Sequence, residues 1–350
     1  MLSFLSFREI NLTYLYSIFG AVAPMGFVFG ALSGSLFAEY LWWPWTFWTY
    51  GIAAFFLGFF ALLVIPHEVG CQLPNRPSFD WQGAISGIAG LVLINVAWNE
   101  APISGWSSPH VYFLLIIGLL IIGFFFYVER KVKDPLLPMS VLDGATGFVL
   151  TCVGTGWGSF GVWLFYTSRF IMEVRGHTAL SFTAQFSPAV LTGILAAGLT
   201  GFMLTHTPVS FTMMVSMCAF FIGQLIGGFA PAGQVYWGMT FISIVVMPFG
   251  MDMSFPAATV ILSNSMPREH QGLAASLVNT FVNYFIATAL GIAGTVEAYS
   301  TPVQDTPELA LKGIRSGFYT SMGLSGCAVV VGMVYFIKTY RKEGWKIMAH

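Results

Sequence analysis

One carboxylate in this sequence lies where charged groups are rare. Asp252 falls about sixteen residues into the apolar stretch 236–263, whereas the rest of the 15 Asp and Glu lie in connectors, in tails or near the end of an apolar stretch. An ionised side chain at that depth in a membrane is costly, so we expect it to face a polar interior. Asp252 is therefore a candidate to bind substrate or exchange protons. The alternative is a structural Asp that bonds a neighbouring hydroxyl or amide.

The residues around Asp252 support this interpretation. Pro248 and Pro256 lie four residues to either side, and Gly250 lies between them. Pro256 has no N–H, so the backbone carbonyl of Asp252 lacks its usual helical partner. This pattern predicts a kinked or broken helix, and such breaks at membrane depth often line binding sites.

Two further groups of polar residues lie inside apolar stretches. Ser276, Asn279, Thr280 and Asn283 recur at the i, i+3, i+4, i+7 spacing of one helix face, and Asn279 and Asn283 are candidates for the substrate or proton site. The alternative is hydrogen bonding between helices, worth about 0.6–2 kcal/mol for each bond. The stretch 146–168 mixes hydroxyls with aromatics that could line a cavity for an amphipathic solute or simply pack: Thr151, Thr155, Trp157, Ser159, Trp163 and Tyr166.

Other kinds of chemistry lack the residues that they need. Gly156–Gly161 matches GxGxxG, but it lies inside an apolar stretch without the strand, turn and helix that a dinucleotide requires. Gly323–Gly326 matches the GxSG of intramembrane serine proteases, but no later stretch supplies a His. All six His fall at or beyond the ends of apolar stretches, and the four Cys lie far apart. We therefore predict no enzyme, no cofactor and no metal site.

The elements that position these residues are transmembrane helices. Charged residues form 8% of the 350 and hydrophobic residues 56%, with a mean hydropathy of +0.77, and a soluble protein could not cover its surface with so few charges. A helix needs about 20 apolar residues to cross a bilayer, and the runs do not alternate as barrel strands do. The predicted fold is an all-α integral membrane protein of about ten spans, near 15–38, 45–65, 82–99, 110–128, 146–168, 184–204, 209–229, 236–263, 272–295 and 316–337.

The distribution of Lys and Arg predicts the orientation of these spans. The N-terminal segment, every second connector and the C-terminal tail carry ten of the 14 cations, and the opposite side carries Arg169, Arg175, Lys312 and Arg315. Because cytoplasmic loops are enriched in Lys and Arg, both termini are expected in the cytoplasm.

The first span carries a pattern of glycines. Gly26, Gly30 and Gly34 recur every four residues, which clears one helix face for close approach of another helix, and Gly20 and Pro24 precede them. A generic packing face is the alternative. The pattern resembles the antiporter motif in the fifth helix of the drug:proton antiporters of the major facilitator superfamily.

Other segments share this resemblance, which covers nearly the whole chain. Residues 42–48 look like the tryptophan-rich turn that opens the sixth helix of that family, and 267–272 are similar to the entry into a late helix. The spans near 82–99 and 110–128 take the place of the two extra helices in the fourteen-span branch. Residues 250–256 resemble those of fungal aminotriazole- and boron-resistance efflux proteins.

The resemblance implies a domain organisation and a truncation. Residues 1–66 would be the last two helices of the N-terminal bundle, 67–145 two linker helices with connectors, 146–340 the C-terminal six-helix bundle and 341–350 a cytoplasmic tail. The first four helices of the family would be missing, together with the Arg of the fourth helix that is tied to proton coupling. By the same resemblance, 146–168 and 236–263 face the central cavity.

The resemblance also implies a function, which is proton-coupled efflux of small molecules of the drug, toxicant or borate type by alternating access. The alternative is a non-transporting truncated membrane protein. Expected partners are the lipid bilayer, a small-molecule substrate and protons. A net charge of −1 argues against nucleic acid, no obligate protein partner is predicted, and the plasma membrane is favoured over the vacuolar membrane.

Overall fold

The chain is a bundle of long helices. The computed structural model describes residues 25–64, 79–133, 135–137, 139, 144–266, 271–301 and 306–345. Nine helical segments of this described part are long and apolar enough to cross a membrane. A further helix covers residues 25–40, and no strand occurs among the described residues. The predicted all-α membrane bundle is confirmed.

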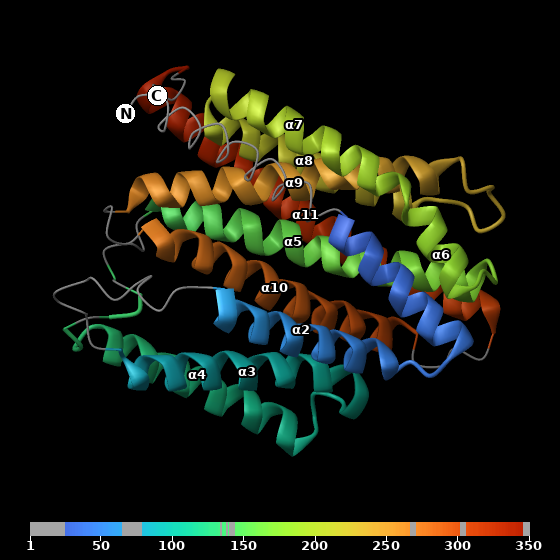
Figure 1. Cartoon of the computed structure of the whole chain (residues 1–350), viewed down its shortest axis with the longest axis horizontal. Coiled ribbons are helices and arrows are strands. Elements are labelled where there is room, and N and C mark those ends of the chain that lie inside the picture. Colours follow the sequence, from blue (N-terminus) through green and yellow to red (C-terminus); the bar gives the residue numbers. More distant parts are fainter. Residues whose placement is uncertain are drawn as a thin grey trace.

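The helices run roughly alongside one another in the bundle (Figure 1). A π-helical turn, Phe170–Val174, extends α5. In chain order the labelled helices are α2 (Trp45–Val64), α3 (Trp81–Ser104), α4 (Pro109–Glu129), α5 (Gly144–Arg169), α6 (Ala179–Phe186), α7 (Pro188–His206), α8 (Val209–Gly228), α9 (Met239–Ser265), α10 (Gln271–Ser300) and α11 (Pro307–Glu343).

Two predicted spans differ from the structure at their ends. The span near 184–204 corresponds to α6 and α7 together, which begin earlier because Thr178 caps α6 by accepting a hydrogen bond from the Ser181 N–H. Pro188 starts α7 as a separate helix. The last helix begins well before residue 316, because Thr306 caps its N-terminus in the same way. The predicted span 15–38 begins outside the described residues.

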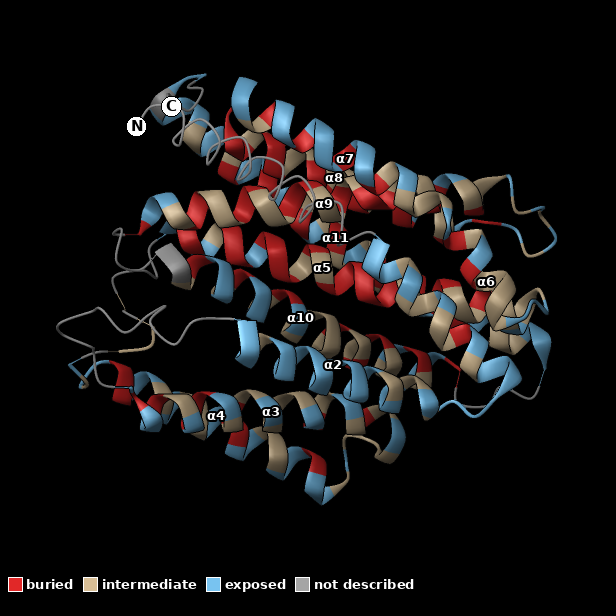
Figure 2. Ribbon diagram, in the orientation of Figure 1, coloured by how far each residue is buried: buried red, intermediate tan, exposed pale blue. Residues whose placement is uncertain are grey.

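The helix α5 occupies the centre of the bundle. It contacts α8, α9, α10 and α11, and Figure 2 shows much of it buried, whereas α2 has no buried residue. The helices α3 and α4 pair with each other at one side of the molecule, and α3 also packs along α10.

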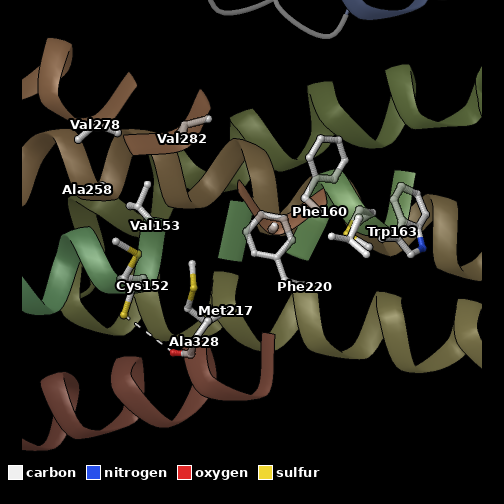
Figure 3. Close-up of a cluster of buried hydrophobic side chains, with 14 of the residues drawn as sticks. Cys152, Val153, Phe160, Trp163, Met217, Phe220, Ala258, Val278, Val282 and Ala328 are labelled. Atoms are coloured by element: carbon white, nitrogen blue, oxygen red, sulfur yellow. Dashed lines mark hydrogen bonds between the residues drawn. The ribbon is translucent and has the colours of Figure 1, made fainter. Parts of the chain in front are cut away.

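The glycines of α5 allow this central position. A Cβ at Gly158 would lie 3.0 Å from the Phe285 backbone oxygen of α10, and one at Gly161 would lie 2.6 Å from Ile286 Cγ2. The glycines of the GxGxxG pattern thus serve close helix packing, and nothing at this pattern resembles a dinucleotide-binding turn. Larger side chains from α5 and α8 fill the core beside it, among them Phe160 and Phe220, as Figure 3 shows.

The helix α9 is continuous although it contains Pro248 and Pro256. Of the predicted kink or break, the break is therefore absent. As expected, Pro256 offers no N–H to the Asp252 carbonyl. The hydroxyl of Thr200 in α7 lies 3.3 Å from that carbonyl oxygen and 2.7 Å from the Ala196 carbonyl of its own helix, so its single proton is shared between the two acceptors and a neighbouring helix supplies part of the missing donor.

Candidate functional site

Asp252 lines a cavity of about 240 Å³ near the middle of the bundle. The walls come from helix 25–40, α5, α6, α7 and α9. Ten residues besides Ala189, Val190 and Asp252 line it: Phe27, Val28, Trp157, Phe160, Trp163, Phe186, Ile244, Met247, Pro248 and Met251. The cavity is apolar apart from its single carboxylate and the edges of its tryptophans.

The two tryptophans of α5 are held in place by α9. The indole N–H of Trp157 donates to Ser254 Oγ at 3.0 Å, and that of Trp163 donates to Ser243 Oγ at 2.9 Å. Both indole donors are therefore satisfied within the protein. What these side chains present to a solute is aromatic surface, which attracts cations and stacks on apolar rings.

Asp252 is half-buried and its carboxylate has no partner within the described part of the chain. No hydrogen bond or ion pair reaches its side-chain oxygens there, and no Lys, Arg or His is among the cavity-lining residues. An isolated carboxylate in apolar surroundings is costly to keep charged. It is therefore available to a proton or a cationic group, either of which neutralises it.

Helix 25–40 is fastened to α6 at one side of this cavity. The Ser35 hydroxyl lies 2.7 Å from Thr183 Oγ1 and donates to the Ala179 carbonyl at 3.1 Å. One turn further, Glu39 Oε1 accepts a hydrogen bond of 2.6 Å from the Leu180 N–H. These polar contacts bring Phe27 and Phe186 together as walls of the cavity, with ring centroids 6.5 Å apart.

Of the predicted site residues, the structure brings Asp252 and Trp163 together and places the others elsewhere. Asn279 and Asn283 lie on an exposed face of α10, where Asn283 Nδ2 donates to the Asn279 carbonyl at 2.8 Å. That face points away from α5 because Val278 and Val282 on the opposite side enter the core. Asn279 and Asn283 therefore do not line the cavity that contains Asp252, and a role for them in binding stays a prediction.

Tyr166 also lies outside the cavity. It is buried, and its hydroxyl donates to Glu297 Oε2 at 2.7 Å. Arg169 Nη1 donates to the other oxygen of Glu297 at 2.6 Å, so α5 and α10 share a partly buried ion pair. The sequence analysis did not predict this pair. A usable signal was present, because Arg169 and Glu297 carry opposite charges and lie near the ends of two spans that are predicted to end on the same side of the membrane.

The glycine pattern of the first span is only partly a packing face. Gly20 and Pro24 lie outside the described residues. A Cβ at Gly30 would lie 3.7 Å from the Tyr50 hydroxyl oxygen, and one at Gly34 would lie 3.8 Å from Thr46 Cγ2, so both face α2. Gly26 has no atom that near, and with Gly30 it lines a second cavity of about 1010 Å³ that shares Phe27 and Phe160 with the cavity at Asp252.

Comparison with known proteins finds one matching family and several similar proteins. The family described as Major Facilitator Superfamily matches residues 6–292. The chain is 47% identical over 341 residues to the low affinity ammonium transporter of Saccharomyces cerevisiae, covering 95% of this chain and 65% of that protein. It is 40% identical over 336 residues to efflux pump terJ of Aspergillus terreus, covering 94% and 64%.

A third relative is the aminotriazole resistance protein of Saccharomyces cerevisiae, at 36% identity over 330 residues, covering 93% of this chain and 60% of that protein. The chain thus spans less than two thirds of the length of these curated relatives. All three are named as transporters, pumps or resistance proteins, and none is named as an enzyme.

Proposed function

Because this chain belongs to the major facilitator superfamily, we propose that it serves proton-coupled efflux of small solutes by alternating access. It is a multi-pass membrane protein and not an enzyme. The observation that carries the proposal is the unpartnered carboxylate of Asp252 in an apolar, aromatic cavity. We infer that a proton and a solute compete for this carboxylate.

Competition at one carboxylate would couple the two movements. A charged carboxylate is stabilised by a bound cation, and the same carboxylate is neutralised by a proton when the solute leaves. Either occupant removes the cost of the buried charge, so the occupied cavity can change its access from one side of the membrane to the other more readily than the empty one. Proton influx then drives solute efflux.

The cavity favours small, basic or amphipathic solutes. Its volume of about 240 Å³ is below the range of roughly 300–1,000 Å³ that is typical of drug-sized ligands. Aromatic walls around a carboxylate suit a nitrogen cation better than borate. The names of the ammonium and aminotriazole relatives agree with small nitrogenous solutes.

We propose the same domain organisation that the sequence indicates. Residues 146–340 would form the C-terminal bundle, in which α5 contacts α8, α9, α10 and α11. Residues 67–145 would form the linker pair, in which α3 packs on α4. Residues 1–66 would belong to the N-terminal bundle and 341–350 to a cytoplasmic tail. The proposed location is the plasma membrane, with both termini in the cytoplasm.

The test is transport by Asp252→Asn in proteoliposomes with an imposed proton gradient. We expect the variant to insert and fold. Its rate of proton-driven efflux of ammonium, methylammonium and aminotriazole should fall by at least about tenfold, which corresponds to a loss of about 1.4 kcal/mol in transition-state stabilisation. Glu100→Gln is the matched control, because Glu100 is an exposed carboxylate near the end of α3 that accepts a hydrogen bond from Ser104. Efflux by Asp252→Asn with the pH dependence of the parent would defeat the proposal.

The second candidate is a non-transporting membrane protein, and the chain spans 65% of the ammonium transporter and 64% of efflux pump terJ. The same assay separates the two. Transport by this chain alone supports the first, whereas transport that appears only when the chain is fused to the preceding part of a full-length relative supports the second.

A further inference from the structure

Asp80 and Glu129 place two carboxylates at one end of the α3–α4 hairpin. Asp80 precedes α3, Glu129 ends α4, and their relative exposures are 6% and 3%. One oxygen of each is bonded. Asp80 Oδ1 accepts from the Gly83 N–H at 2.8 Å, and Glu129 Oε2 accepts from the Leu137 N–H at 3.0 Å. Glu129 thus holds the connector that leads from α4 towards α5.

The other two oxygens face a common gap. Asp80 Oδ2 and Glu129 Oε1 are buried and have no hydrogen-bond partner among the residues that the structure describes. A Cβ placed on Gly83 would lie 2.7 Å from Glu129 Oε1 and closer still to Asp80 Oδ2. Both unpartnered oxygens therefore lie close to the same point over Gly83, which only a residue without a side chain leaves free.

No cation of the described residues neutralises this pair. Arg130, Lys131 and Lys133 of the following connector are exposed, and none forms an ion pair with either carboxylate. The titratable side chains of the neighbouring helix α10 lie further along it, with Glu297 bonded to Arg169 and Tyr284 beside Thr288.

A single proton is the occupant that this geometry fits. Two buried carboxylates so close together cannot both be ionised at small cost. A proton on one carboxylate makes it an O–H donor to the other, which satisfies both unpartnered oxygens at once. A calcium ion needs six to eight oxygen ligands and magnesium needs six, whereas this gap offers two.

We propose that Asp80 and Glu129 bind one proton between them, and that this shared proton fastens the connector after α4 to the start of α3. The site is separate from Asp252 and does not depend on the transport proposal. When the pH rises and the proton leaves, the two charges repel each other. The hairpin end then opens, and the Leu137 N–H loses its partner.

Hydrogen exchange of the segment containing Leu137 tests this in the purified chain in lipid nanodiscs. After correction for the intrinsic pH dependence of amide exchange, we expect the protection factor of this segment to fall by about tenfold or more as the pH is raised from acidic to alkaline. A fall of this size is expected because a hydrogen bond to a charged group is lost. A protection factor that stays constant over this range would overturn the proposal without any variant.

Two single substitutions, Glu129→Gln and Asp80→Asn, sharpen the test. Each carboxamide supplies an N–H to the remaining carboxylate without titrating, so protection should stay high at every pH. Each should also remove the infrared C=O band of a protonated carboxyl, whereas Glu100→Gln, elsewhere on α3, should keep both the band and the pH step. A parent-like pH step in both variants would contradict a shared proton. Protection restored at alkaline pH by added Na⁺ or Ca²⁺ would show a metal site instead.

Discussion

At Asp252, the side chain and the main chain have different partners. The carboxylate faces the cavity, while its backbone carbonyl, left without a helical donor by Pro256, accepts from Thr200. A buried carbonyl without any partner would cost about 1–3 kcal/mol. The shared proton of one hydroxyl therefore helps α9 to accommodate a proline four residues after Asp252.

We predict that Thr200→Val lowers the free energy of unfolding by about 1–3 kcal/mol, because valine keeps the shape and removes the donor. The midpoint of thermal unfolding in detergent measures it. Thr192→Val is the control, since the Thr192 hydroxyl bonds only to carbonyls of its own helix, those of Pro188 and Ala189. In a Pro256→Ala background, which restores the N–H, the effect of Thr200→Val should largely vanish; an undiminished effect would refute this explanation.

At the scale of the element, the position of α5 depends on where its glycines lie around the helix. Gly154, Gly158 and Gly161 face α10, and Gly156 faces Met217 and Phe220 of α8. Gly147, in the same helix, has open space where its Cβ would be. Without a hydrophobic driving force between helices in lipid, such close contacts supply the packing energy.

Gly158→Ala should destabilise the bundle by about 1–3 kcal/mol, because its methyl group would push against the Phe285 backbone and force α5 and α10 apart. Gly147→Ala, in the same helix, should change stability by no more than about 1 kcal/mol and in the favourable direction, as expected from helix propensity. Thermal unfolding of the two variants compares them directly, and equal effects would show that the contact with α10 is unimportant.

At the scale of the whole molecule, the helices form a bundle whose orientation in the membrane is a prediction from charge. Lys131 lies in the connector after α4 and Lys312 in the first turns of α11, and both are exposed. The excess of Lys and Arg places the first in the cytoplasm and the second on the opposite side.

In a background with the four native cysteines replaced, Lys131→Cys should react with a membrane-impermeant maleimide only after the cells are opened. Lys312→Cys should react in intact cells. Labelling of Lys131→Cys from outside would reverse the proposed orientation, and with it the proposed direction of solute transport.

The sequence alone determined the fold class and the position of Asp252 within a long apolar helix. These follow from local chain properties, since a run of about 20 apolar residues is helical and membrane-spanning wherever it occurs, and a carboxylate in its middle is buried whatever its neighbours are.

Tertiary structure decided which residues meet. The polar face of α10 was visible from spacing, but its direction depends on which side packs against α5, and this turned Asn279 and Asn283 away from Asp252. The pairs Arg169–Glu297 and Asp80–Glu129, and the contact of Thr200 with Asp252, join residues far apart in the chain. No local pattern specifies such pairs, because they depend on how the helices are rotated and set against one another.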